Sequence, residues 1–412
     1  MPYKLVKGGV CAPRGFLGGA VSCGIKNPKD PRTDLALLYS EFPCISAGTF
    51  TTNRVKAAPV KVTQAHLRAL ECRAIVVNSG NANACTGVKG VEDARAMAKS
   101  VAKSLGLRQR EVGVCSTGVI GLPLPMDRIL PALTALPDHL GPAGGSALAK
   151  AIMTSDTSIK EVAVLATVGG KKIRIGACAK GAGMICPSMA TMLCFVTTDA
   201  SIGKACLQKC ILEAVEGSFN RICIDGDMST NDTVLVLANG IAGGPRVVRG
   251  SKACRQFRDA LQYVMLKLAK ACVRDGERVT KFVTLEVRGA STYLDAKKVA
   301  EAVAKSALVK ASWNGNDPNW GRIIHAIGYS RARIREELID IDYEGKSACV
   351  GGLMAETPIK VLREIAGRDS FAITVNLHLG KAEYTIYTSD ISPEYIDFNR
   401  SEYSYWKNAG LG

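Results

Sequence analysis

Short apolar runs with β-branched members recur along the 412-residue chain and predict buried strands. The runs lie at residues 74–78, 112–117, 192–198, 234–238 and 283–287. Polar, glycine-containing segments follow several of them, such as the loop at 79–87. We therefore expect candidate catalytic and binding residues at the strand ends and in the loops that follow them.

Between the predicted strands, apolar residues recur at helical spacing. The pattern predicts helices at 92–105, 205–217, 251–272, 296–309 and 353–366. The 251–272 segment has the clearest apolar face, made of Phe257, Leu261, Val264, Met265, Leu268 and Cys272.

The pattern changes at about residue 290, where a smaller α/β unit is expected to begin. The segment 313–322 is rich in Asn, Gly and Pro and predicts a loop. Residues 371–378 and 382–387 predict two strands, and Gly380-Lys381 between them predicts a hairpin turn.

Composition is that of a globular protein, with 47% hydrophobic and 22% charged residues. No apolar run reaches the ~18 residues of a membrane-spanning helix. The first residues lack a signal-peptide core and an amphipathic presequence, so we expect a cytoplasmic protein.

The 15 cysteines have irregular spacing, without a Cys-x-x-Cys, and the four histidines do not sit beside a cysteine pair. We therefore expect neither a zinc site nor a disulfide framework, and interpret most cysteines as reduced core residues.

The net charge of +16 is compatible with two kinds of partner. A basic surface can bind nucleic acid, or it can steer anionic small molecules into a cleft. The basic residues are scattered, and the densest run, 246–258, contains a single aromatic residue, Phe257. We favour the second interpretation.

The segment 180–193, Lys-Gly-Ala-Gly-Met-Ile-Cys-Pro-Ser-Met-Ala-Thr-Met-Leu, is the most distinctive in the chain. Gly181 and Gly183 allow backbone angles that other residues avoid, and Pro187 fixes its own φ. The turn thus delivers the hydroxyl of Thr191 to the start of a strand. Such geometry suits a nucleophile, and it equally suits a tight turn in a core.

This segment resembles the self-cleavage motif of the ornithine acetyltransferase family, the glutamate N-acetyltransferases of arginine biosynthesis. The resemblance extends through further motifs along nearly the whole chain. It implies a cut between Ala190 and Thr191, leaving an α chain of residues 1–190 and a β chain of residues 191–412. Thr191 would then be the N-terminal nucleophile.

At the end of the strand at 112–117, Thr117 and Gly118 form a turn that exposes one hydroxyl and one backbone N–H. An oxyanion hole needs two such donors, although an ordinary turn has the same sequence. The family resemblance assigns Thr117 and Gly118 to the oxyanion hole.

The resemblance also implies a set of substrate contacts. On the residues alone, Thr154 could simply satisfy a turn, Lys180 could be a surface lysine and Glu277 could be a solvated turn residue. The implied set comprises Thr154, Lys180, Thr191, Glu277, Asn399 and Ser404. Ser404 stands where the family usually has Thr, Ser188 where Asn is common, and residues 405–412 extend past the usual end.

Three carboxylates, Asp225, Asp227 and Asp232, at first sight suggest a metal loop. They lack the spacing and terminal Glu of a calcium-binding EF-hand. The family has this run without a required metal, so we expect it to brace the site near Thr191.

The fold implied is the family's four-layer α/β/β/α sandwich over residues 1–285. A smaller α/β domain over 286–392 and a tail over 393–412 that returns to the active site complete it. The implied reaction is ping-pong transfer of acetyl from N-acetylornithine to glutamate without metal or bound cofactor, with acetyl-CoA an open possibility as a second donor. Two α and two β chains would assemble. The alternative is a self-processing amidase or aminopeptidase, which would hydrolyse its acyl-enzyme.

Overall fold

The computed structural model describes residues 3–26, 31–68, 71–186 and 192–400. The predictions for Ser188, Ala190, Thr191, Ser404 and residues 405–412 lie outside these residues. The chain forms two compact units. The first contains residues 1–181, 188–220 and 228–272, and the second contains residues 182–187, 221–227 and 273–412.

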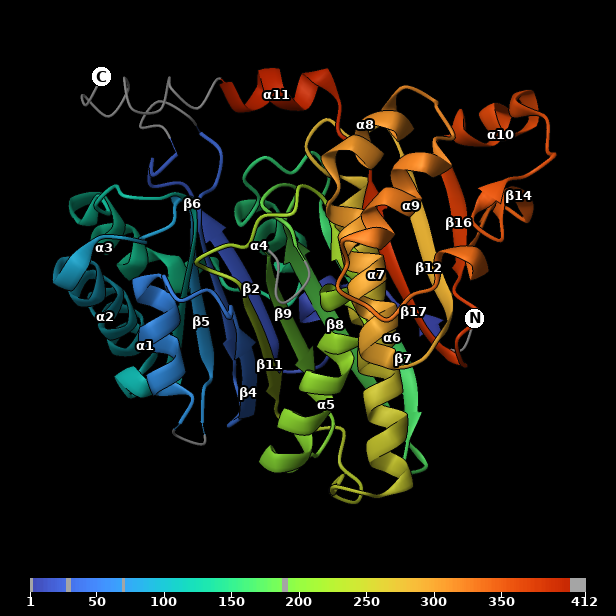
Figure 1. The fold of residues 1–412 in the computed structure, drawn as a ribbon. Coiled ribbons are helices and arrows are strands. Elements are labelled where there is room, and N and C mark those ends of the chain that lie inside the picture. Colours follow the sequence, from blue (N-terminus) through green and yellow to red (C-terminus); the bar gives the residue numbers. More distant parts are fainter. Residues whose placement is uncertain (1–2, 27–30, 69–70, 187–191, 401–412) are drawn as a thin grey trace. The chain divides into compact units, whose positions relative to one another are not determined.

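The first unit is built on two β-sheets (Figure 1). Its six-stranded sheet has the order β1 (Lys4–Leu5), β7 (Lys160–Val168), β8 (Lys171–Lys180), β9 (Leu193–Thr198), β11 (Thr233–Ala238) and β4 (Ile45–Phe50). Its four-stranded sheet has the order β2 (Phe16–Val21), β3 (Leu35–Ser40), β5 (Ala74–Asn81) and β6 (Val112–Val119).

Two parallel pairs within these sheets bring segments that are distant in sequence side by side. β5 pairs with β6 in one sheet, and β9 pairs with β11 in the other. Every residue of β9 and β11 is buried, which agrees with their continuous apolar sequences. Thr117, near the end of β6, and Leu193, at the start of β9, therefore have fixed neighbours on the adjacent strands.

Helices cover the outer faces of both sheets. Helices α1 (Ala58–His66), α2 (Gly87–Leu105) and α3 (Met126–Ala135) pack on the four-stranded sheet, where Val62, Met97 and Ile129 meet Leu35 and Val76. On the other sheet, α5 (Lys204–Glu216) packs against β4, and α6 (Lys252–Arg274) faces β7 (Figure 1).

A second core lies between the two sheets, where Leu38 and Ile75 of one sheet meet Phe195 and Leu235 of the other. The layers of the first unit are thus helix, sheet, sheet and helix. The predicted α/β/β/α architecture is confirmed. The short helix α4 (Gly145–Ala151) adds Leu148 and Ala149 to this inner core.

The second unit contains a seven-stranded sheet. Its order is β10 (Ile222–Cys223), β17 (Ala382–Ser389), β12 (Phe282–Ala290), β16 (Ser370–Asn376), β13 (Asp340–Tyr343), β14 (Lys346–Val350) and β15 (Leu353–Met354). Its helices are α7 (Tyr293–Lys305), α8 (Ala307–Asn314), α9 (Trp320–Gly328), α10 (Ile359–Ala366) and α11 (Pro393–Arg400). Trp313, Tyr343 and Tyr384 are its largest fully buried side chains.

The predicted hairpin at Gly380-Lys381 is wrong. β16 and β17 do not pair with each other, because β12 lies between them, parallel to β16 and antiparallel to β17. Local turn residues could not reveal this, since the intervening strand comes about 90 residues earlier in the chain.

Three other predicted segments are also corrected. The expected helix at 296–309 is two helices, because Ser306 ends α7 and its hydroxyl caps the N-terminus of α8. The expected helix at 353–366 begins only at Ile359, after Pro358. Helices α8 and α9 extend into both ends of the predicted loop at 313–322.

All 15 cysteines are free, and all except Cys23 and Cys85 are buried, which agrees with their interpretation as reduced core residues. Among the described residues, none of the helices combines the length and apolar character that a membrane crossing requires.

Candidate active site

Thr117 and Gly118 lie at the end of β6, beside Gly80 and Asn81 of β5. Gly118 has a φ of +132°, and a Cβ added to it would lie 2.2 Å from the carbonyl carbon of Gly80. A residue with a side chain therefore does not fit at position 118. The close approach of the two strands orients the Thr117–Gly118 peptide.

Lys180 ends β8, and its ammonium donates a hydrogen bond of 3.3 Å to the hydroxyl oxygen of Thr117. Both side chains are buried, Lys180 being only 3% exposed. A hydroxyl that accepts from an ammonium keeps its own proton available for another acceptor and becomes a stronger donor. The hydrogen bond from Lys180 thus makes the Thr117 hydroxyl a stronger donor to a negatively charged oxygen.

A buried carboxylate, Asp156, holds the neighbourhood of Lys180 in place. Its Oδ1 accepts from Lys160 Nζ and from the Gly181 N–H, both at 2.7 Å. Its Oδ2 accepts from the Thr154 N–H at 3.0 Å and lies 4.0 Å from Lys180 Nζ. Burial alone would raise the pKa of Asp156, but the charges of Lys180 and Lys160 lower the pKa to about 2.

The group formed by Asp156, Lys160 and Lys180 carries two positive charges against one negative charge. Lys160 is 2% exposed, so water screens this charge poorly. The surplus positive charge lies next to the Thr117 hydroxyl, where it favours an oxyanion or a substrate carboxylate.

We expect Asp156→Asn to lower the free energy of unfolding by about 3 kcal/mol, because it leaves two buried lysines without their anion. Denaturant unfolding, with the exposed Asp138→Asn as the matched control, measures this. An Asp156→Asn protein as stable as the wild type would show that Asp156 does not balance the two lysines.

A second buried carboxylate, Asp232, contacts the residue that follows Thr191 in the chain. Asp232 directly precedes β11, and Met192 directly precedes the parallel strand β9. The Met192 N–H donates to Asp232 Oδ1 at 3.0 Å, and the Thr233 N–H donates to the Met192 carbonyl at 3.1 Å. The entry into β9, one peptide bond after Thr191, is therefore fixed at Asp232.

Asn231 joins this strand entry to the end of β6. Its Nδ2 donates to the Ser116 carbonyl at 2.8 Å and to the Ala82 carbonyl at 2.7 Å. Ser116 directly precedes Thr117, and Asn231 directly precedes Asp232. A continuous path of short contacts therefore runs from Thr117 through Asn231 and Asp232 to Met192.

The Asp232 carboxyl group is fully buried, and its Oδ2 has no hydrogen-bond partner among the described residues. Burial raises the pKa of Asp232 well above its ordinary value, although the Met192 N–H and the charge of Lys180 oppose the rise. The raised pKa favours the neutral, protonated form of Asp232, and a protonated carboxyl group can act as a proton donor.

In the second unit, Glu277 and Asn399 lie together, with Asn399 Nδ2 donating to Glu277 Oε2 at 3.3 Å. The Glu277 N–H donates to the Ala182 carbonyl at 2.8 Å. A Cβ on Gly183 would lie 2.5 Å from the Glu277 carboxyl group, so a side chain at position 183 would displace that carboxyl group. The structure thus pairs two of the predicted substrate contacts with the glycine-rich part of the 180–193 segment.

Asp225 binds the same segment within the second unit. Its carboxylate accepts from the N–H groups of Met184 and Ile185, the latter at 2.8 Å. Burial raises the pKa of Asp225 to about 6, against the opposing effect of these hydrogen bonds. Asp225 thus holds Met184 and Ile185 in the second unit, and Asp232 holds Met192 in the first. The predicted bracing of Thr191 itself lies outside the described residues.

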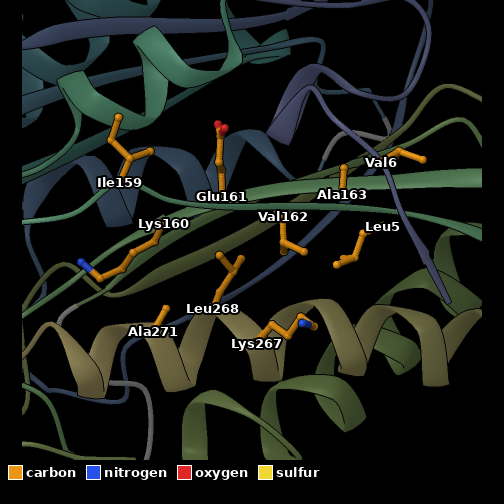
Figure 2. A pocket seen from close by; sticks show the side chains of 10 residues that line it. All are labelled: Leu5, Val6, Ile159, Lys160, Glu161, Val162, Ala163, Lys267, Leu268 and Ala271. Atoms are coloured by element: carbon orange, nitrogen blue, oxygen red, sulfur yellow. The ribbon is translucent and has the colours of Figure 1, made fainter. Parts of the chain in front are cut away.

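A cavity of about 410 Å³ lies between β7 and α6 in the first unit (Figure 2). Its ten lining residues are Leu5, Val6, Ile159, Lys160, Glu161, Val162, Ala163, Lys267, Leu268 and Ala271. Lys160 belongs both to this wall and to the Asp156 group, whereas Thr117, Gly118, Thr154 and Lys180 do not line the cavity.

The structure adds Asp156, Lys160 and Asn231 to the residues that the sequence predicts for the site. Asp156 lies two residues after Thr154 and Asn231 directly precedes Asp232, so both are neighbours of residues that the sequence indicates. Lys160, at the start of an amphipathic strand, gave no signal, because nothing in its sequence context distinguishes it from a surface lysine.

A model of the ArgJ family matches residues 18–404 of the chain. An "Arginine biosynthesis bifunctional protein ArgJ" from Symbiobacterium thermophilum is 46% identical over 394 residues, covering 96% of this chain and 98% of the relative. A protein of the same name from Geobacter sulfurreducens is 46% identical over 387 residues, covering 94% and 98% respectively.

A crystal structure of ornithine acetyltransferase from Mycobacterium tuberculosis, complexed with ornithine, contains a chain that is 42% identical to this one. The match covers 45% of this chain and 98% of that chain, with a TM-score of 0.42. The sequence matches confirm the family that the cleavage motif predicts. With a family model and relatives that match across nearly its whole length, the chain belongs to the ArgJ family.

Proposed function

We propose that this chain is a glutamate N-acetyltransferase that transfers acetyl from N2-acetyl-L-ornithine to L-glutamate after cleaving itself between Ala190 and Thr191. Family membership supports the reaction. The observation that carries the assignment of residues is the path from Thr117 through Asn231 and Asp232 to Met192. It ties Met192, the residue that follows Thr191, to a polarised hydroxyl and a buried acid.

In the self-cleavage step, the Thr191 hydroxyl attacks the Ala190 carbonyl carbon, and the tetrahedral intermediate expels the Thr191 nitrogen. Expulsion of an amine requires a proton, and we assign its donation to Asp232, a role supported by its raised pKa and by its hydrogen bond with the Met192 N–H. The proton lost by the attacking Thr191 hydroxyl replaces the one that Asp232 gives up. The resulting ester between Ala190 and Thr191 is then hydrolysed by water. The products are a carboxylate at Ala190 and a free amine at Thr191.

In the transfer step, the Thr191 α-amine acts as the general base for its own hydroxyl. An α-amine has an ordinary pKa of about 7.7–8.0, so a useful fraction is neutral near pH 7. The hydroxyl attacks the acetyl carbonyl of N-acetylornithine, and ornithine leaves with the proton. Glutamate then attacks acetyl-Thr191 and leaves as N-acetylglutamate.

Thr117 and Gly118 stabilise the oxyanion of both acyl-transfer steps, through the hydroxyl and the backbone N–H. Lys180 raises the donor strength of Thr117 by its hydrogen bond to the hydroxyl oxygen. Thr154, Lys180, Glu277 and Asn399 contact the substrates, and Ser404 replaces the usual Thr at the final contact. The surplus positive charge at Lys180 and Lys160 suits the carboxylate of either amino acid.

Thr117→Val should lower kcat for acetyl transfer by about 10²-fold, because one of two oxyanion donors is lost without a change in side-chain shape. The matched control is Thr134→Val, a threonine on the exposed side of α3. Steady-state kinetics measure kcat for both variants. An unchanged kcat in Thr117→Val would show that Thr117 is not an oxyanion donor.

The mature protein is proposed to assemble from two α and two β chains in the cytoplasm and to need neither metal nor bound cofactor. Acetyl-CoA remains a candidate second donor, since two relatives are named as bifunctional proteins. Incubating the cleaved protein with acetyl-CoA and glutamate, and assaying N-acetylglutamate, tests this second activity.

The experiment that tests the main proposal supplies purified protein with N-acetylornithine, first alone and then with glutamate. We expect acetyl-Thr191 on the β chain in the first incubation and N-acetylglutamate in the second. Release of free acetate in place of transfer would identify a hydrolase, the amidase alternative, and contradict the proposal.

A further inference from the structure

Three cysteine side chains from two helices meet in the first unit, and none of them belongs to the candidate active site. Cys206 and Cys210 are one turn apart on α5, and Cys254 lies on α6. Their sulfur atoms all lie within 4.8 Å of one another. Cys254 Sγ is 3.1 Å from Cys206 Sγ and 3.7 Å from Cys210 Sγ.

The three thiols are almost completely buried, with exposures of 2% for Cys206, 1% for Cys210 and 7% for Cys254. Metal ions with soft character bind thiolates in preference to oxygen ligands. Three sulfurs placed trigonally at a metal–sulfur distance of about 2.3 Å are about 4 Å apart, so small side-chain rotations convert the observed cluster into a coordination sphere.

Two features of the surroundings oppose the effect of burial on the thiols. Cys206 and Cys254 are each the third residue of their helix, where the positive end of the helix dipole stabilises an anion. The charge of Lys209 also lowers the pKa of Cys206, although burial dominates and raises it to about 12. A cation that binds the three sulfur atoms would displace the thiol protons.

We propose that Cys206, Cys210 and Cys254 form a three-coordinate site for a soft monovalent cation, with copper(I) as the ion to test. Zinc prefers four ligands, and among the described residues no further His, Cys, Asp or Glu belongs to this group. Copper(I) accepts three sulfurs. On binding, three S–H bonds lose their protons to solvent, three copper–sulfur bonds form, and the oxidation state stays unchanged.

The site would join α5 to α6 on the same face of the six-stranded sheet (Figure 1). The linear spacing of the cysteines does not indicate it, because Cys254 comes 44 residues after Cys210. The proposal gives three of the buried cysteines a role beyond packing. The inference stands apart from the proposed acetyl transfer, since none of its residues belongs to that site.

The test titrates the fully reduced full-length protein with copper(I) in the absence of oxygen, in competition with the chelator bathocuproine disulfonate. We expect one copper(I) per chain to transfer from the chelator, and at least a tenfold loss of affinity in Cys206→Ser, Cys210→Ser and Cys254→Ser. Cys349→Ser, which removes a buried thiol of the second unit, and Cys85→Ser, which removes an exposed one, are matched controls that should bind as the wild type.

X-ray absorption at the copper edge of the wild-type complex gives a second readout that does not depend on the folding of any variant. Three sulfur neighbours are expected. The proposal is overturned if the reduced protein takes no copper, if the three serine variants bind like the controls, or if fewer than three sulfurs surround the ion. A Cys206–Cys254 disulfide that survives reduction would likewise overturn it and identify a structural disulfide.

Discussion

Thr191→Ala should remain a single uncut chain of about 43.6 kDa and show no acetyl transfer. The substitution removes the only hydroxyl that the proposed mechanism uses both to break the Ala190–Thr191 bond and to carry the acetyl group. Both losses should therefore appear together. A denaturing gel and an assay of N-acetylglutamate measure them on the same preparation.

Thr191→Ser is the matched control for this variant, because serine retains the hydroxyl without the methyl group. It should cleave itself, even if more slowly, and should recover transfer in proportion to the amount cleaved. If Thr191→Ala transferred acetyl at the wild-type rate, another residue would be the nucleophile, and the proposed mechanism would be wrong.

Asp232→Asn should slow self-cleavage by at least about 10²-fold, the usual contribution of a positioned proton donor. Asparagine retains an oxygen that can accept the Met192 N–H, so the entry of β9 stays in place. It cannot donate an acidic proton to the departing nitrogen of Thr191. The variant thus removes the proton-donor role of Asp232 while keeping its hydrogen bond with Met192. The rate at which the β chain appears measures the effect.

The pH profile gives a readout that a purely structural role for Asp232 would not produce. As the proposed proton donor, Asp232 must be protonated for cleavage, so the wild-type rate should fall as the pH rises through its raised pKa. Asp232→Asn should lack this fall. Asp259→Asn, which changes an exposed carboxylate on α6, should cleave like the wild type. A normal rate and pH profile in Asp232→Asn would exclude Asp232 as the proton donor.

The fold lowers the pKa of Asp156, in contrast to that of Asp232, and the stability of the protein in acid tests this effect. Because the folded-state pKa of Asp156 is lowered to about 2, its ionised form stabilises the fold above the ordinary Asp pKa of about 4. This contribution, about 2 kcal/mol, should be lost as the pH falls from about 4 towards 2. Unfolding curves across this range should show a smaller acid-dependent decrease in Asp156→Asn than in the wild type.

Elements with a long, regular pattern were predictable from the sequence. The apolar face from Phe257 to Cys272 predicts α6 to within two residues of its observed end at Arg274. The apolar run at 234–238 likewise predicts β11. The order of strands in a sheet was not predictable in this way, because the pairing of β12 with both β16 and β17 depends on contacts between distant segments.

Within the site, the sequence indicates residues with distinctive motifs and misses those whose role depends on burial. Thr117 and Gly118 were indicated by a predicted strand and Thr-Gly turn, although the turn itself is wrong because β6 continues through both residues to Val119. Lys160 is an ordinary strand residue until the fold buries it against Asp156. The cluster of Cys206, Cys210 and Cys254 likewise depends on the tertiary fold, because it forms only where α5 and α6 lie together.

Mass spectrometry of the intact protein, freshly folded from denaturant and then supplied with N-acetylornithine, tests the central claim most directly. The account predicts that one mass is replaced by two, for residues 1–190 and 191–412, and that the second then gains one acetyl group on Thr191. An undivided chain that still produces N-acetylglutamate, or acetyl found on any other residue, would contradict it.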